Sequence, residues 1–168
     1  MSDANQLAPD RSAAPRLSYA TGLTLDMAET MARAAVAEAG RQGIAISVAI
    51  VDAGGHLVNF ARMNDAMLAS IQIATDKAYT AVVGKIPTYL WQNLLQSGEL
   101  PQLFVHDRWT AFTGGFPIVQ GTRLLGAVGI SGAEKFGDTT VARAALLAGD
   151  MRTTEIDGYL KDVLGVTL

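Results

Sequence analysis

The segment VDAGGHLVNFARM, residues 51–63, brings together three side chains that could carry chemistry. His56 can ligate a metal ion or exchange a proton near neutral pH. In a proton-transfer enzyme it would be the catalytic acid/base, Asp52 would orient it, and Arg62 would hold a substrate carboxylate. The structural alternative is a plain turn, because aspartate commonly caps turns and a hairpin histidine commonly bonds to the backbone.

The second histidine, His106, lies in the segment VHDRW beside Trp109. His56 and His106 are the candidate metal ligands, because the chain has no cysteine. For a bound haem they are also the first candidates for the axial ligand, and Thr113 and Tyr79 come next. The structural alternative for His106 is a loop histidine stacked on Trp109, in which case both residues would contribute only to packing.

Lys77 and the pair Gly114–Gly115 are further candidate ligand-binding residues. Lys77 could hold a carboxylate in place of Arg62, although charged residues in mid-helix, such as Asp76–Lys77, usually form an exposed face. Gly114 and Gly115 would let a ligand approach the backbone closely. They would serve equally well in a tight connection.

These residues are positioned by predicted helices and hairpins. Thr24 is a good N-cap for the first helix, Asp65 or Ser70 for the second, and Pro87 suits a first helical position. Apolar periodicity predicts helices over 24–43, 64–85, 87–98 and 137–151, strands over 44–52, 56–63, 116–120 and 123–131, and a loop over 99–112.

The predicted strands form two hairpins, with turns at 53–55 and 121–122. Strict alternation would place His56, Val58, Phe60 and Arg62 on one face of their strand. In both hairpins one face carries bulky residues and the other carries small ones, which allows either a closely packed helix or room for a ligand. Two hairpins flanked by helices predict an α/β sandwich around a mainly antiparallel central sheet.

Composition limits the class of protein. The chain has 168 residues, 49% of them hydrophobic, and a net charge of -3, so we expect one domain over 18–168 and no nucleic-acid partner. Residues 1–17 are polar and rich in alanine and proline, which predicts a flexible tail without a secretory signal. Because no apolar run approaches the roughly 18 residues of a membrane helix, we expect no membrane association and a cytoplasmic location.

Several segments together resemble the GlcG/HbpS family, which includes the C-terminal domain of PduO-type proteins. The resemblance covers roughly residues 23–149 and rests on VAIVDAGGHLVNFARM, SIQIATDKAYTAV, GGFPI, and LLGAVGISG followed by a helix that carries Asp138. The family's Asp-Ala-Gly-Gly-His turn falls on Asp52 to His56, its Arg-Met pair on Arg62–Met63, and its Asp-Lys-Ala motif on Asp76 to Ala78. One departure is RMNDAMLAS, where the family usually continues Arg-Met-Asp-Gly-Ala.

The resemblance implies a profilin-like sandwich and assembly into a homo-oligomer. Some members bind haem, and PduO-type domains bind haem or a corrinoid. Other members occur beside catabolic genes without a settled activity. The first hypothesis is therefore a small-molecule-binding protein, with haem as the named ligand. The alternatives are a catabolic enzyme that isomerises or tautomerises a small organic acid, and a structural oligomeric module without a ligand.

Overall fold

The computed structural model describes residues 22–98, 106–133 and 137–150. The predicted tail, residues 1–17, lies outside these ranges, as do the first half of the predicted loop over 99–112 and the C-terminal residues from 151 onward. The domain limits 18–168 therefore stay a prediction.

The described chain forms a four-stranded antiparallel sheet with the strand order β2-β1-β4-β3. Both predicted hairpins are present. The elements are α1 (Leu25–Arg41), β1 (Ser47–Asp52), β2 (Leu57–Arg62), α2 (Ala69–Gly84), α3 (Thr88–Gln96), β3 (Gly115–Gln120), β4 (Arg123–Ser131) and α4 (Gly137–Ala148). The predicted α/β sandwich with an antiparallel sheet is confirmed.

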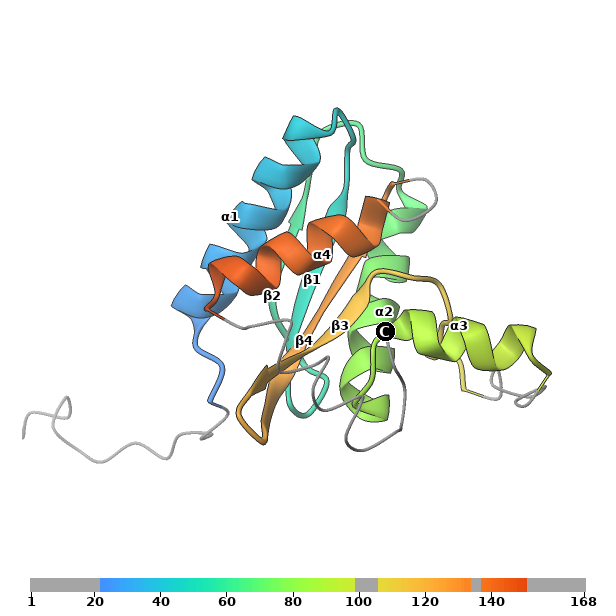
Figure 1. Cartoon of the computed structure of the whole chain (residues 1–168). Coiled ribbons are helices and arrows are strands. Elements are labelled where there is room, and N and C mark those ends of the chain that lie inside the picture. Colours follow the sequence, from blue (N-terminus) through green and yellow to red (C-terminus); the bar gives the residue numbers. More distant parts are fainter. Residues whose placement is uncertain (1–21, 99–105, 134–136, 151–168) are drawn as a thin grey trace, which may run out of the picture.

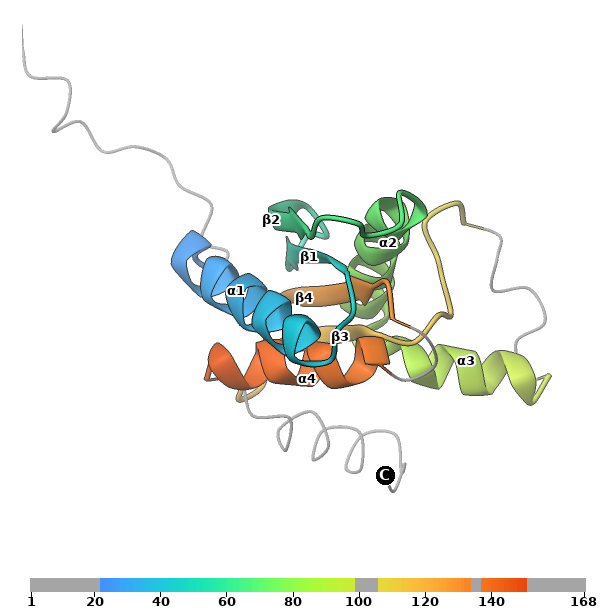
Figure 2. The ribbon, with the colours of Figure 1, turned by 90° about the horizontal axis from the view of Figure 1, so that it is seen from above.

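Helices cover both faces of the sheet (Figures 1 and 2). Helix α2 packs on one face, whereas α1 and α4 lie side by side on the other. The bulky strand residues belong to the core under α1 and α4, which includes Val48, Ile50, Val128 and Ile130. The small strand residues Ala49 and Ala127 pack against α2. On this face of the sheet, α2 packs closely against the small residues and occupies the space that a ligand could have used.

Gly129 shows how close α2 lies to the sheet. A Cβ atom at this position of β4 would lie 2.1 Å from the carbonyl oxygen of Ala74 and 2.6 Å from the amide nitrogen of Ala78. Both are backbone atoms of α2, so the clash could be relieved only by moving the helix.

We therefore expect Gly129→Ala to lower the free energy of unfolding by at least about 2 kcal/mol, which urea denaturation would measure. Gly40→Ala is the matched control, because a Cβ there would meet nothing within 4 Å. That change lies in a helix and should be neutral or stabilise by up to about 1 kcal/mol. Equal effects of the two substitutions would contradict the close packing of α2.

Helix α1 begins as predicted, since the Thr24 hydroxyl accepts a hydrogen bond from the Met27 amide at 3.2 Å. The prediction that Asp65 or Ser70 is the N-cap of α2 is wrong. Its N-cap is Leu68, which makes no capping bond through its side chain. Ser70 is buried, and its hydroxyl lies 2.7 Å from that of Ser47 on β1. The hydroxyl of Ser70 therefore has a hydrogen-bond partner on a strand inside the sandwich, and the local sequence does not reveal that partner.

Two other helix boundaries differ slightly from the prediction. Pro87 is the N-cap of α3 and not its first helical residue. Helix α1 ends at Arg41, two residues before the end of the predicted range 24–43, and Gly40 lies inside the helix. Helix ends commonly shift by one or two residues without any change in packing.

A β-bulge breaks the predicted alternation in β2. Ile50 pairs with Asn59 and Val51 pairs with Leu57, so Val58 is an extra residue. Val58 consequently packs into the core under α1 and α4, whereas Phe60 packs on the α2 side. The prediction that His56, Val58, Phe60 and Arg62 share one face is therefore wrong.

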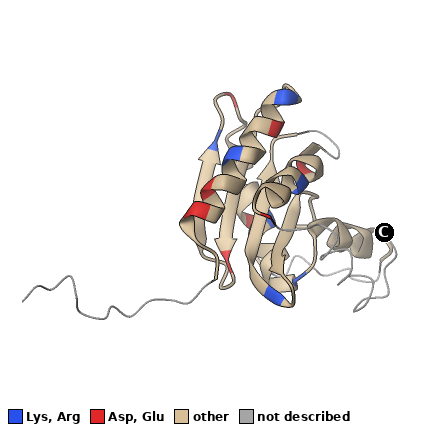
Figure 3. Cartoon of the chain, turned by 60° about the vertical axis from the view of Figure 1, so that its left-hand side comes forward, with Lys and Arg blue, Asp and Glu red and all other residues tan. Residues whose placement is uncertain are grey.

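The outer surface of α1 carries charges of both signs (Figure 3). Arg33 pairs with Glu29 at 3.3 Å, and Arg41 pairs with Glu38 within the same helix. Exposed pairs of this kind contribute little stability. No helix in the described ranges is both long enough and apolar enough to cross a membrane.

Candidate functional site

The turn between β1 and β2 is held by the carboxylate of Asp52. Its Oδ1 atom accepts hydrogen bonds from the backbone amides of Gly54 at 2.8 Å and His56 at 3.0 Å. Gly55 has a φ of 78°, a left-handed conformation that suits glycine. The Asp52 side chain thus holds the backbone that carries His56. No hydrogen bond joins it to the imidazole ring.

We expect Asp52→Ala to destabilise the protein by about 1–3 kcal/mol, because two backbone amides lose a charged acceptor. Asp52→Asn keeps a side-chain oxygen in the same place and should cost clearly less. Urea denaturation of both variants would measure the difference. Equal losses would show that the oxygen of residue 52 does not stabilise the turn.

His56 is exposed, and its imidazole has no hydrogen-bond partner among the described residues. The adjacent Gly55 lies against α2, since a Cβ there would be 2.9 Å from Cδ2 of Tyr79. The Arg108 guanidinium lies over the same tyrosine, 3.7 Å from the ring centroid. The turn, Tyr79 and Arg108 therefore form one connected surface region beside the exposed imidazole of His56.

Arg108 also lies near Asp76, with 3.9 Å between Nε and Oδ1. Burial raises the pKa of the Asp76 carboxyl, and the hydrogen bond from Gln72 and the charge of Arg108 oppose that shift. Arg108 was not among the candidates from the sequence. Its position depends on a loop returning to α2, which no local pattern indicates.

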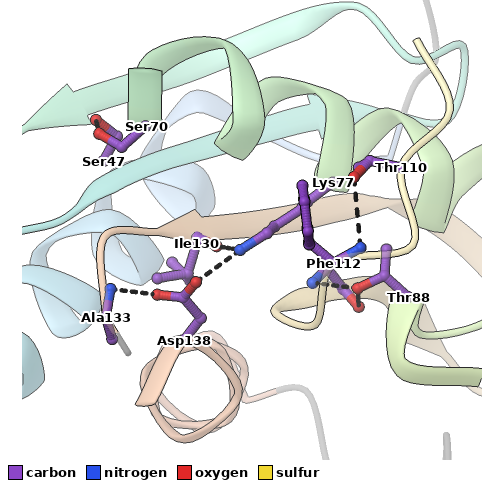
Figure 4. A network of polar contacts seen from close by, with 10 residues as sticks. Ser47, Ser70, Lys77, Thr88, Thr110, Phe112, Ile130, Ala133 and Asp138 are labelled. Atoms are coloured by element: carbon purple, nitrogen blue, oxygen red, sulfur yellow. Dashed lines mark hydrogen bonds and ion pairs between the residues drawn. The ribbon is translucent and has the colours of Figure 1, made fainter. Parts of the chain in front are cut away.

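Lys77 does not lie on an exposed helix face. The interpretation of Asp76–Lys77 as part of an exposed face is therefore wrong for Lys77. Only 2% of Lys77 is exposed. Its ammonium donates to Asp138 Oδ2 at 2.6 Å and to the carbonyl oxygen of Ile130 at 2.7 Å (Figure 4). Burial lowers the pKa of Lys77, and the Asp138 carboxylate opposes that shift. Lys77 and Asp138 therefore form a buried ion pair that joins α2 to α4.

Gly114 and Gly115 make the close approach that glycines allow, but to the protein itself. A Cβ on Gly114 would lie 2.7 Å from the Asp138 Cβ atom, and one on Gly115 would lie 2.4 Å from the Lys77 carbonyl oxygen. Gly114 also has a φ of 112°. In this structure both glycines let the start of β3 pack onto the ion pair.

His106 and Trp109 lie in a different aromatic group. Their ring centroids are 6.3 Å apart, and Trp109 meets Trp91 edge-on at 4.9 Å. His106 is exposed. The described residues contain no group of three histidine, aspartate or glutamate side chains that could hold a metal ion. A metal role for His56 or His106 would thus need a cofactor that brings its own ligands.

The structure does not bring together the residues of the proton-transfer hypothesis, which are His56, Asp52 and either Arg62 or Lys77. Arg62 is exposed and pairs with Ser47, at the end of the hairpin away from the turn. Lys77 is bonded to Asp138 and Ile130 and not to the turn. Asp52 and His56 remain neighbours. The enzyme hypothesis stays a prediction.

Asp138 was expected only as a residue near the start of a helix, where it does lie. Its partner Lys77 is 61 residues away in sequence. The Oδ1 atom of Asp138 also accepts a hydrogen bond from the Ala133 amide at 2.8 Å. The spacing of Lys77 was the available signal: it lies three residues after Ala74 and four before Ala81, and helix residues three or four apart share a face.

A family model described as "Haem degrading protein HbpS-like" matches residues 23–147. The chain belongs to the HbpS-like family. The predicted membership of the GlcG/HbpS family is confirmed.

Two curated relatives support this HbpS-like assignment. Protein GlcG of Escherichia coli K12 is 32% identical over 109 residues, which are 65% of this chain and 81% of GlcG. The corrinoid adenosyltransferase PduO of Citrobacter freundii is 33% identical over 150 residues, 88% of this chain. The match spans 44% of PduO, so less than half of that enzyme corresponds to the present chain.

A solved HbpS-like structure shares the fold. The crystal structure titled "PduOC:Heme Complex" superposes with a TM-score of 0.69 at 32% sequence identity, over 75% of this chain and 94% of that one. That structure is a complex with haem, so this relative binds haem.

Proposed function

We propose that this protein binds haem and that His56 is the axial ligand. The observation that carries the proposal is the exposed imidazole of His56, which has no partner among the described residues although Asp52 holds its backbone. A histidine nitrogen is a common axial ligand of haem iron. The haem complex of a relative with 32% identity supports the choice of cofactor.

The surroundings of His56 fit a haem that lies on the surface. Leu57, next in sequence, is 55% exposed and offers apolar contact. The Arg108 side chain is 45% exposed and can pair with a propionate group. Tyr79 connects Arg108 to the turn. When bound, haem would supply iron redox or oxygen chemistry, and these residues would hold and orient it.

Titration of the apoprotein with haemin, followed by absorption spectroscopy, tests the proposal. We expect a Soret band distinct from that of free haemin, saturating at one haem for each chain. A spectrum that stays that of free haemin through a several-fold excess would contradict haem binding. Pyridine haemochrome analysis of protein purified from cells grown with haem provides an independent measure.

We also propose that the protein is a homo-oligomer. Three large apolar side chains just before and at the start of α2 are exposed: Met67 at 65%, Leu68 at 71% and Ile71 at 38%. Apolar surface of this kind often marks a contact between proteins. Light scattering should show a particle at least twice the chain mass of 17.7 kDa. A particle of single-chain mass at micromolar concentration would contradict this.

A further inference from the structure

A second candidate site lies around the buried ion pair. A cavity of about 290 Å³ is bounded by α2, α3, the segment before β3, the end of β4, and α4. It is lined by Ile73, Lys77, Gln92, Phe112, Thr113, Ser131, Ala133 and Asp138. None of the residues proposed to hold haem lines this cavity.

Lys77 has one hydrogen-bond donor left for this cavity. An ammonium group carries three N–H donors, and Lys77 uses one on Asp138 and one on Ile130. Each carboxylate oxygen of Asp138 accepts one hydrogen bond, from Lys77 and from Ala133 respectively. The printed bonds of the described residues therefore leave one N–H donor of Lys77 for the cavity.

Two hydroxyl groups of mostly buried residues line the same cavity. Ser131 is 6% exposed and Thr113 is 9% exposed. Neither side chain makes a hydrogen bond to another described residue, and both line the cavity. Neither hydroxyl is among the fully buried side-chain atoms that lack a partner, so both are accessible for a hydrogen bond to a ligand oxygen or nitrogen. Gln92 of α3 adds an amide to the lining.

We propose that this cavity binds a small uncharged compound that carries carbonyl and hydroxyl oxygens. The third N–H of Lys77 and the hydroxyls of Ser131 and Thr113 supply the hydrogen bonds. Ile73, Phe112 and Ala133 supply the apolar wall. The cavity volume is near the lower end of the range for ligand pockets, so the compound has a short carbon chain.

The charges of the lining determine that the ligand is uncharged. Lys77 and Asp138 neutralise each other at 2.6 Å, and among the described residues that line the cavity they are the only charged ones. A carboxylate ligand would lose its hydration without gaining an unpaired cation from the described lining residues, which costs free energy. The lowered pKa of Lys77, which results from burial, is consistent with such surroundings.

Hydroxyacetone and glycolate make a matched pair of probes, since they have similar size and each carries a hydroxyl, but only glycolate is charged. In a ¹H–¹⁵N NMR titration we expect hydroxyacetone to shift the amide signals of Thr113, Ser131 and Ala133. The dissociation constant of so small a ligand should be roughly millimolar. Glycolate should bind at least tenfold more weakly. Tighter binding of glycolate, or no shift at these amides with hydroxyacetone, would overturn the proposal.

Removing the two free hydroxyls tests the geometry without disturbing the ion pair. Thr113→Val combined with Ser131→Ala should weaken hydroxyacetone binding at least tenfold and leave the melting temperature near that of the wild type. Thr75→Val is the matched control, because Thr75 bonds to Ile71 on α2 and does not line the cavity. Unchanged affinity in the double variant would overturn the assignment. Haemin titration of the single variant Ser131→Ala should be unaffected, because Ser131 is not a candidate haem ligand, so failure here and failure of the haem proposal are distinguishable.

Discussion

Replacing Lys77 with methionine should lower the free energy of unfolding by about 3–5 kcal/mol, because the substitution leaves the buried carboxylate of Asp138 without its cation. Asp138 is 5% exposed, so water solvates its carboxylate less well than the ammonium group does. Methionine has a similar length, which keeps the loss of packing small. Urea denaturation followed by circular dichroism would measure the change.

The control for this variant removes both charges together. In the double variant Lys77→Met with Asp138→Asn, residue 138 keeps an oxygen for the Ala133 amide and no unpaired charge remains buried. We expect the double variant to recover more than half of the stability lost in Lys77→Met. A single variant that loses less than about 1 kcal/mol would show that the pair does not have the energetic role expected of a buried ion pair.

Replacing His56 with alanine should weaken haem binding at least tenfold and remove or displace the Soret band, because the iron loses its axial nitrogen. The stability of the apoprotein should change by no more than roughly 0.5 kcal/mol, since the exposed imidazole has no partner among the described residues. Haemin titration and thermal unfolding of the same sample give both quantities.

His106→Ala is the matched control for His56→Ala. It removes the other histidine, which is also exposed but lies beside Trp109 and not at the turn. Haem binding should be retained in this variant. If His56→Ala binds haem as tightly as the wild type, His56 is not the ligand. Loss of the Soret band only in His106→Ala would move the ligand assignment to His106.

Elements whose signals are local could be predicted from the sequence. The two hairpins follow from period-2 alternation interrupted by turn residues, and both turns lie where glycine permits them. Helix α1 likewise follows from its own residues, because the hydroxyl of Thr24 meets an amide only three residues away. The segment 51–63 was also recognisable as a possible site, since its turn and its histidine are adjacent in sequence.

Tertiary structure alone decided which charged and polar residues meet. Lys77 looked like an exposed helical residue, yet it is buried because α2 lies against the small face of the sheet and α4 brings Asp138 to it. The bulge at Val58 reversed a strand face that simple alternation had assigned. The physical reason is the range of the interactions: a turn or a cap depends on residues a few positions apart, whereas a buried ion pair depends on segments brought together by packing of the whole sheet.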